Sequence, residues 1–388
     1  MNHYFLILLA TFICGSSARA GLFAPDEQTA EQPVPFTIRR DAQGKPLAEP
    51  LAHAFFKSLL NERTEALLNQ FPLSTVRKEN GVDKVTLTFK GKAKERIDRR
   101  MPMVAKLSAD ELTGLSADLI RMGRDAEAIG ILAPKSRDRS PDYRHIANLV
   151  FAHANNGDWQ AAYDRQDSLL LDVDPPTNVT GLTKDQLAWL LRLDREGIRR
   201  WLQIRRVIAN KPTPEQAPGE DTQVYPLFED AQKQPVKFVN DKGIYEPGKL
   251  AAAERAKLPP DAIAIVQQLA LWSPGDSMLL WLLAELYAAD GRLVDAADAF
   301  DQCTARALTK PKSLMEHRAA VRAAVERLPK PAPIELPTLV EPPMQPPQEK
   351  GLFAVVSREQ FIVVISLFGL VVGLLAALQV RAILRRRR

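Results

Sequence analysis

Cysteine is almost absent from this sequence of 388 residues, which contains only Cys14 and Cys303. Cys14 lies in an apolar N-terminal run that we expect to be removed, so that Cys303 would be alone in the mature chain. A single cysteine cannot form an intrachain disulfide. A secreted domain stapled by disulfides is therefore excluded, and a conventional hydrophobic core is expected instead.

The motifs of common catalytic and nucleotide-binding sites are also missing. There is no glycine-rich phosphate loop ending in Lys-Ser or Lys-Thr, no G-x-S-x-G elbow and no H-E-x-x-H. His145 and His153 are two turns apart on one predicted helix, whereas a metal pair needs i, i+4 spacing. We expect no catalytic residue, metal or cofactor, and interpret Cys303 as a buried structural thiol. An enzyme with its site within residues 175–260 is the weaker alternative.

Excess positive charge is confined to the ends of the chain. The formal net charge is +5, but without Arg19 and five C-terminal arginines residues 21–360 carry 46 basic and 47 acidic side chains, a net charge of −1. Nucleic-acid binding depends on a concentrated basic surface. Nucleic acid is therefore not expected as a partner.

Both ends carry membrane-targeting patterns. The apolar run over residues 4–14 is followed by Ala18-Arg19-Ala20, which predicts signal-peptide cleavage before Gly21. Residues 361–380 are uncharged and would form a helix of about 30 Å, the thickness of a bilayer core. The arginines that follow should hold that end in the cytoplasm; they are Arg381, Arg385, Arg386, Arg387 and Arg388. We predict a single-pass protein of the bacterial inner membrane with a periplasmic ectodomain.

Most of the ectodomain has helical periodicity. A helix is predicted over residues 51–71, a short strand over 85–89, and helix–turn–helix units over 107–174 and 246–326. Ala128 and Ala162 are 34 residues apart, and so are Ala262 and Ala296. A period that recurs in two places predicts a helical solenoid. The alternative is a non-repetitive helical bundle.

The last unit resembles a known repeat family. Leu283-Ala284-x-x-Tyr287 followed by Ala296-x-x-x-Phe300 resembles the tetratricopeptide repeat, although Leu280 stands at the family's tryptophan position and Ala284 replaces its glycine. The resemblance implies helix pairs that stack through small residues and bind proteins or peptides. It places the binding surface on the inner face of the units around residues 279–308.

The segment between the two groups of repeats has features of its own. Residues 183–209 predict a long amphipathic helix, and residues 236–245 suggest a small hairpin. The apolar side of the helix is formed by Leu187, Leu190, Leu191, Ile198, Trp201, Leu202 and Ile208. Another side carries Arg192, Arg195, Arg199 and Arg206. This side is either a basic face for an acidic partner or, in the interpretation we prefer, a solvated face neutralised by Asp194, Glu196 and neighbouring elements.

A proline-rich segment separates the helices from the predicted membrane span. Eight prolines lie between residues 329 and 347, which favours an extended stalk of roughly 60 Å. The predicted fold is mainly α: a TPR-like α-solenoid ectodomain with a small irregular or β insert, and one C-terminal transmembrane helix. The predicted parts are a signal peptide (1–20), a flexible leader (21–50), an N-terminal helical region with a short strand (51–106), repeats (107–174), an insert (175–245), repeats (246–326), a stalk (327–350), a membrane helix (361–380) and a tail (381–388).

These patterns predict a non-catalytic, membrane-anchored interaction or scaffold protein with a protein or peptide partner. The alternative is an accessory subunit of a membrane complex that acts through its transmembrane helix. Within that helix, Gly369, Gly373 and Ala377 lie on one face, and such a stripe allows close helix packing in lipid. A homodimer could form through this face.

Bulky side chains on the small-residue face should weaken this association. The substitutions Gly369→Leu and Gly373→Leu, or the corresponding isoleucines, are expected to lower the self-association signal in a membrane two-hybrid assay, because they prevent close backbone approach. An unchanged signal would remove the idea of a dimer formed through this face.

Overall fold

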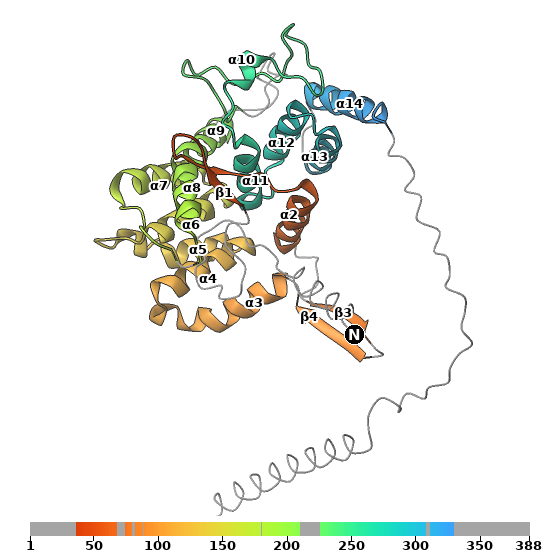
Figure 1. The fold of residues 1–388 in the computed structure, drawn as a ribbon. Helices are drawn as coiled ribbons and strands as arrows, with labels where there is room; N and C mark the ends of the chain where they lie inside the picture. The colour runs from red at the N-terminus through yellow and green to blue at the C-terminus, as the bar shows by residue number, and fades with distance from the viewer. Residues whose placement is uncertain are drawn as a thin grey trace, which may run out of the picture. The chain divides into compact units, whose positions relative to one another are not determined.

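The computed structural model describes residues 36–67, 74–79, 82–87, 89–179, 181–209, 226–307 and 311–329. This part of the chain is mainly helical (Figure 1). The helices belong to one compact unit of the chain, which ends at Leu328. No helix in the described ranges is long and apolar enough to cross a membrane. The expected signal peptide, membrane helix and arginine tail, and nearly all of the expected stalk, lie outside these ranges.

The elements have the following bounds. The α-helices are α2 His53–Leu67, α3 Phe89–Arg100, α4 Ala109–Arg121, α5 Asp125–Leu132, α6 Tyr143–Asn155, α7 Trp159–Asp172, α8 Lys184–Leu193, α9 Arg199–Ala209, α10 Ala252–Arg255, α11 Ala262–Trp272, α12 Ser277–Ala289, α13 Leu293–Arg306 and α14 Lys312–Glu326. The 3-10 turns are Met101–Lys106 and Lys135–Arg137, and a π turn spans Asp194–Ile198. The strands are β1 Ile38–Arg40, β2 Pro46–Ala48, β3 Ser74–Glu79 and β4 Val82–Leu87.

Helices α4 to α7 form two stacked hairpins, as the sequence predicted for residues 107–174. Helix α4 begins at a capping box, in which Ser108 and Glu111 satisfy each other's backbone N–H groups. The turns that follow α4 and α6 hold Gly123 and Gly157 at φ values of 67° and 83°, a conformation that side chains with a Cβ rarely adopt. Helix α6 packs against α4, α5 and α7, so the two hairpins share one interface.

The long helix predicted over residues 183–209 is present, but the π turn interrupts it between α8 and α9. Thr183 caps its N-terminus. Its buried side chains include Leu187, Trp189, Leu190, Leu193, Ile198, Trp201 and Leu202. Ile208, which was expected on the apolar side, is 41% exposed in the last turn of α9.

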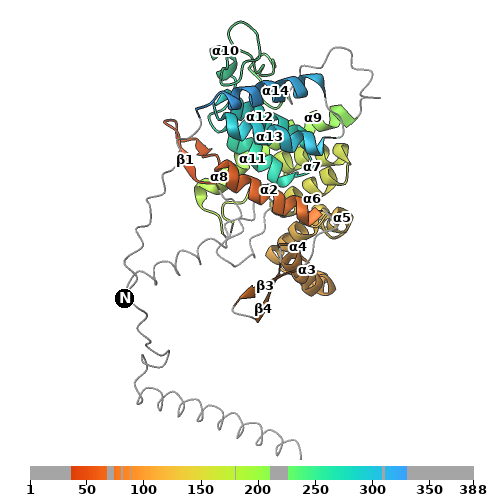
Figure 2. The ribbon, with the colours of Figure 1, turned by 90° about the vertical axis from the view of Figure 1, so that its right-hand side faces the viewer.

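Helices α11 and α12 lie at the centre of the core. Every side chain of α11 except Ile263 is buried, and so are residues 279–289 of α12. A helix that is apolar all round needs neighbours on every side. Helix α11 lies among α2, α8 and α12 (Figures 1 and 2). Trp272 at its end packs on Phe151 of α6, with ring centroids 5.1 Å apart. The two predicted groups of repeats therefore share one core with the helix between them.

The N-terminal segment differs from the expectation. Residues 36–50 were expected to belong to an extended or disordered leader, but they form an antiparallel hairpin in which Ile38 faces Ala48. Phe36, Leu47 and Ala48 are buried, and the Phe36 ring lies 5.4 Å from that of Trp189. The segment is polar by composition, and the apolar surface that orders it belongs to α8, which is distant in the sequence.

Two predicted β features also differ. The strand expected over residues 85–89 is β4, which pairs with β3 and ends at Leu87, because α3 already begins at Phe89. No hairpin forms over residues 236–245, and within residues 226–251 the only β pairing is a single bridge between Glu229 and Pro235. The alternating Val236 and Phe238 bury their side chains in the core instead of pairing with a second strand.

The buried carboxylate of Asp261 joins three parts of the chain just before α11. Its Oδ2 accepts hydrogen bonds from the indole Nε1 of Trp189 at 2.9 Å, from the backbone N–H of Ala48 at 3.4 Å and from the Arg192 guanidinium. Asp261 is 2% exposed. A carboxylate in such a place is stable only with partners of this kind.

Removing the charge of Asp261 should strongly destabilise the fold. The substitution Asp261→Asn leaves Arg192 without its buried counterion, and breaking a buried ion pair in this way costs about 3–5 kcal/mol. Urea unfolding of the full chain in detergent micelles, followed by tryptophan fluorescence, would measure the loss. The matched control is Asp185→Asn, which removes an ion pair with Arg40 whose side chains are 51% and 39% exposed and should cost at most about 1 kcal/mol. Equal losses for the two variants would contradict the role given to Asp261.

Candidate functional site

All residues predicted for the repeat core lie inside the protein. Ala128, Ala162, Ala262, Leu283, Ala284, Tyr287, Ala296 and Phe300 are each at most 5% exposed. They are distributed over α5, α7, α11, α12 and α13. The residues predicted for membrane-helix packing (Gly369, Gly373 and Ala377) and for topology (Arg381 and Arg385 to Arg388) lie outside the described residues.

The face predicted to bind a partner, around residues 279–308, is covered along α12. Helix α2 occupies part of it, with His53 Nε2 lying 2.7 Å from Asp298 Oδ2 on α13 and Lys57 Nζ donating to Asp298 Oδ1 at 2.6 Å. Gln267 of α11 also contacts the N-terminal segment. Its side chain donates a hydrogen bond to the backbone carbonyl of Leu51 and accepts one from the backbone N–H of the same residue. The N-terminal segment of the same chain therefore lies against part of the face on which the repeat resemblance placed the partner.

The histidines and the cysteine have structural surroundings. His145 Nε2 lies 3.0 Å from the carbonyl oxygen of Ala109, and His317 Nδ1 lies 2.7 Å from the buried Glu285 carboxylate. The thiol of Cys303 donates to the carbonyl of Ser277, and burial raises its pKa to about 12. Among the described residues, no group of three His, Cys, Asp or Glu side chains could hold a metal ion.

Three buried carboxylates each accept a hydrogen bond from a tryptophan indole. Besides the Trp189–Asp261 pair, Trp201 donates to Asp276 at 3.0 Å and Trp281 donates to Glu285 at 2.8 Å. Two of the pairs join residues more than 70 positions apart. No local sequence pattern signals these two pairs, and they hold separate helices together, whereas Trp281 and Glu285 are four residues apart within α12.

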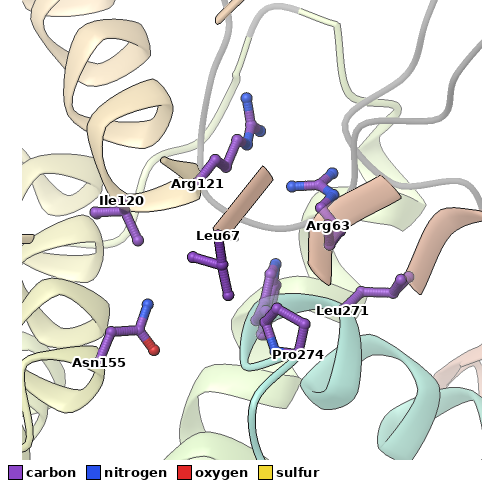
Figure 3. Close-up of a pocket in the computed structure, with 8 residues that line it drawn as sticks. Arg63, Leu67, Ile120, Arg121, Asn155, Leu271 and Pro274 are labelled. Atoms are coloured by element: carbon purple, nitrogen blue, oxygen red, sulfur yellow. The ribbon is translucent and has the colours of Figure 1, made fainter. Parts of the chain in front are cut away.

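One enclosed pocket lies between α2, α4, α6 and the turn from α11 to α12 (Figure 3). Arg63 and Arg121 come from different helices and flank Leu67, with Asn155 and Pro274 on other sides. Its volume is about 20 Å³, which is room for roughly one water molecule. The pocket is too small for an organic ligand.

A larger and more open cleft of about 380 Å³ lies between α9 and the irregular segment 226–259. Basic side chains predominate on its walls: Arg195, Arg199, Arg200, Lys233 and Lys257, with Glu196 and Glu229 as the acidic members. Tyr163, Gln203, Leu227, Phe228 and Pro259 complete the lining. We refer to this site as the basic cleft and regard it as the candidate functional site.

The predicted row of arginines divides between the core and this cleft. Arg192 binds Asp261 in the interior, and Arg206 stacks on Tyr163 with its guanidinium carbon 4.1 Å from the ring centroid. Arg195 and Arg199 line the basic cleft. The exposed Arg199 pairs with Asp167, which fits the solvated, neutralised face that we preferred. Arg192 is neutralised but only 10% exposed. Arg195 is exposed and forms no ion pair with another described residue.

Sequence reasoning missed the other wall of the cleft. Glu229, Lys233 and Lys257 belong to a stretch without helical or strand periodicity, and only the folded chain brings them opposite α9. Arg200 donates to Glu229 at 2.5 Å across the cleft, which ties the two walls together. No family model, no curated protein and no solved structure matches this chain.

A buried acid lies beneath the cleft, in the π turn. Burial raises the pKa of Asp194 to about 7, although the hydrogen bond donated by the Tyr143 hydroxyl at 2.8 Å opposes the shift. The Gln166 side chain donates to the backbone carbonyl of Asp194 at 2.9 Å. The Asp194 side chain therefore points into the core, away from the arginines of the cleft.

The stability of the protein should depend on pH through Asp194. The folded pKa lies above the unfolded one, so the folded state binds the proton more tightly, and stability from this group is lost as pH rises from about 4 to about 7. The Asp194→Asn variant should not show this loss. Its free energy of unfolding should therefore rise relative to that of the wild type as pH increases across this range, by up to roughly 4 kcal/mol. Urea unfolding at several pH values would measure the difference.

A second variant tests the cause. Tyr143→Phe removes the hydrogen bond that lowers the pKa of Asp194, so the pH midpoint of the stability loss should move upward. A stability difference between Asp194→Asn and the wild type that does not change with pH would show that Asp194 does not titrate in this range.

Proposed function

We propose that this chain is a non-catalytic, membrane-anchored interaction protein of the bacterial envelope, whose ectodomain is an α-solenoid of tetratricopeptide-like helix pairs. Three helix pairs support this proposal, because in each of them a short turn joins two antiparallel helices. They are α4–α5, α6–α7 and α12–α13. Their second helices carry Ala128, Ala162 and Ala296, which are fully buried. Small residues of this kind allow neighbouring helices to approach closely.

In this proposal a further pair lies between α6–α7 and α12–α13. Its first member is the long helix made of α8, the π turn and α9, and its second member is α11. A Cβ atom added at Gly197 in the π turn would lie 3.8 Å from Cγ2 of Ile265, which indicates close approach of the two helices. The segment 210–261 then becomes an insertion between the two helices of one pair. Buried side chains of helices from α4 to α14 belong to one hydrophobic core, and stacking of more than two pairs is what stabilises such arrays.

The single observation that carries the interaction function is the basic cleft, an open cleft of about 380 Å³ lined mainly by basic side chains. The predicted stalk and the uncharged run over residues 361–380 would hold this ectodomain at the inner membrane, with the arginine tail in the cytoplasm. A protein or peptide is the partner class that such a surface favours.

The test is site-specific cross-linking in cells that express the full chain. Benzoylphenylalanine placed at position 203, in the cleft, should yield a cross-linked partner on illumination, whereas the same group at the exposed position 139 should not. Protease added to spheroplasts should degrade the adduct, because both partners would lie outside the cytoplasm. An adduct protected from protease would contradict the proposed topology, and equal adducts at both positions would contradict the cleft as the binding site. Deletion of residues 246–310 is not a usable test, because it removes the centre of the core.

A further inference from the structure

We infer that the basic cleft binds an acidic peptide segment of a partner protein, with Arg195 as its primary anchor. This inference deepens the proposed function and rests on it. It places the site on α9 and the segment 226–259, away from the α12 face that the repeat resemblance implied.

Arg195 is the cleft's uncommitted positive charge. It is exposed, and no hydrogen bond or ion pair joins it to another described residue. The neighbouring Glu196 also lines the cleft, but its Oε2 lies 3.4 Å from Arg192 and 3.8 Å from Lys45, so its charge is matched by those two cations. Asp194 is bonded to Tyr143 in the core. The π turn thus exposes Arg195, and each adjacent acid is paired with another residue.

Two further cations of the cleft are themselves exposed. Arg199, whose side chain is 51% exposed, pairs with Asp167 at 2.8 Å, and Lys233, at 79% exposed, pairs with the more buried Glu229 at 2.9 Å. An ion pair with an exposed cation contributes little to stability, so a ligand carboxylate can compete for these cations at small cost. Guanidinium groups bind carboxylates through two parallel hydrogen bonds, which adds geometric specificity.

The remaining charges are fixed and shape the walls. Arg200 bridges to Glu229, and Lys257 pairs with Glu254 at 3.1 Å between side chains that are both about 15% exposed. These internal bonds hold the basic groups in place before a ligand arrives, which lowers the ordering cost of binding.

The lining favours a peptide over a polyphosphate backbone or a lipid surface. Glu196 and Glu229 alternate with the basic residues, and they would repel the evenly spaced phosphates of a nucleic acid or the charged plane of a membrane. Tyr163, Phe228 and Pro259 offer apolar contacts, which suit the side chains beside carboxylates in a polypeptide. The near-neutral ectodomain also lacks the broad basic field on which nucleic-acid binding depends.

The experiment measures binding of a dye-labelled hexaglutamate peptide to the full chain in non-ionic micelles by fluorescence anisotropy. Arg195→Glu should weaken binding about tenfold or more, as expected for loss of a charge-assisted hydrogen-bonded pair. Arg199→Glu should weaken it in the same direction. The matched control Arg139→Glu makes the same charge change at an exposed residue outside the cleft and should stay within about twofold of the wild type. Circular dichroism confirms that each variant is folded.

Three results would overturn the inference: equal binding of hexaglutamine, tighter binding of hexathymidylate or of anionic lipid vesicles than of hexaglutamate, or equal effects of Arg195→Glu and Arg139→Glu. The proposed function fails separately, through the cross-linking and protease results in cells, because the peptide affinity of the purified chain does not depend on membrane topology.

Discussion

The carboxylate of Asp261 is the interaction on which most of this structure depends. It accepts hydrogen bonds from residues 69 to 213 positions away, in β2 and α8, at the point where α11 begins. Apolar contacts are not directional, so they alone do not set how α8 and the N-terminal hairpin align with α11. A buried charge that is stable only when Trp189, Arg192 and Ala48 all reach it favours one arrangement of these segments over the alternatives.

The same chemistry recurs through the core. Asp276 accepts from Trp201, and Glu285 accepts from Trp281 while His317 of α14 approaches the same oxygen. Asp276 links the start of α12 to α9, and Glu285 links α12 to α14. Helices α11 and α12 are buried on all sides. These polar links help to determine which elements pack around them. Helix α2 is held by polar contacts as well, because Gln267 bonds the backbone of Leu51 just before α2 and Asp298 of α13 lies 2.7 Å from His53.

Arg192 at the end of α8 and Arg195 in the π turn are three residues apart but have different surroundings. Arg192 faces a buried acid and becomes part of the core, whereas Arg195 is displaced by the π turn into an open cleft. Burial makes the first pair strong and inaccessible, and exposure leaves the second charge free to meet a ligand.

The sequence by itself determined the local elements: the paired helices of residues 107–174 and 261–306, the long helix over 183–209, and the buried positions of the repeat core such as Ala284 and Tyr287. Helical periodicity and glycine turns are local signals, so they could be read without the fold. Only the tertiary structure decided that residues 36–50 are ordered against α8, that α2 packs against α11 and reaches α13, and that Lys233, Lys257 and Arg195 line one cleft. These outcomes depend on contacts between residues far apart in the chain, and the periodicity of either partner alone does not specify them.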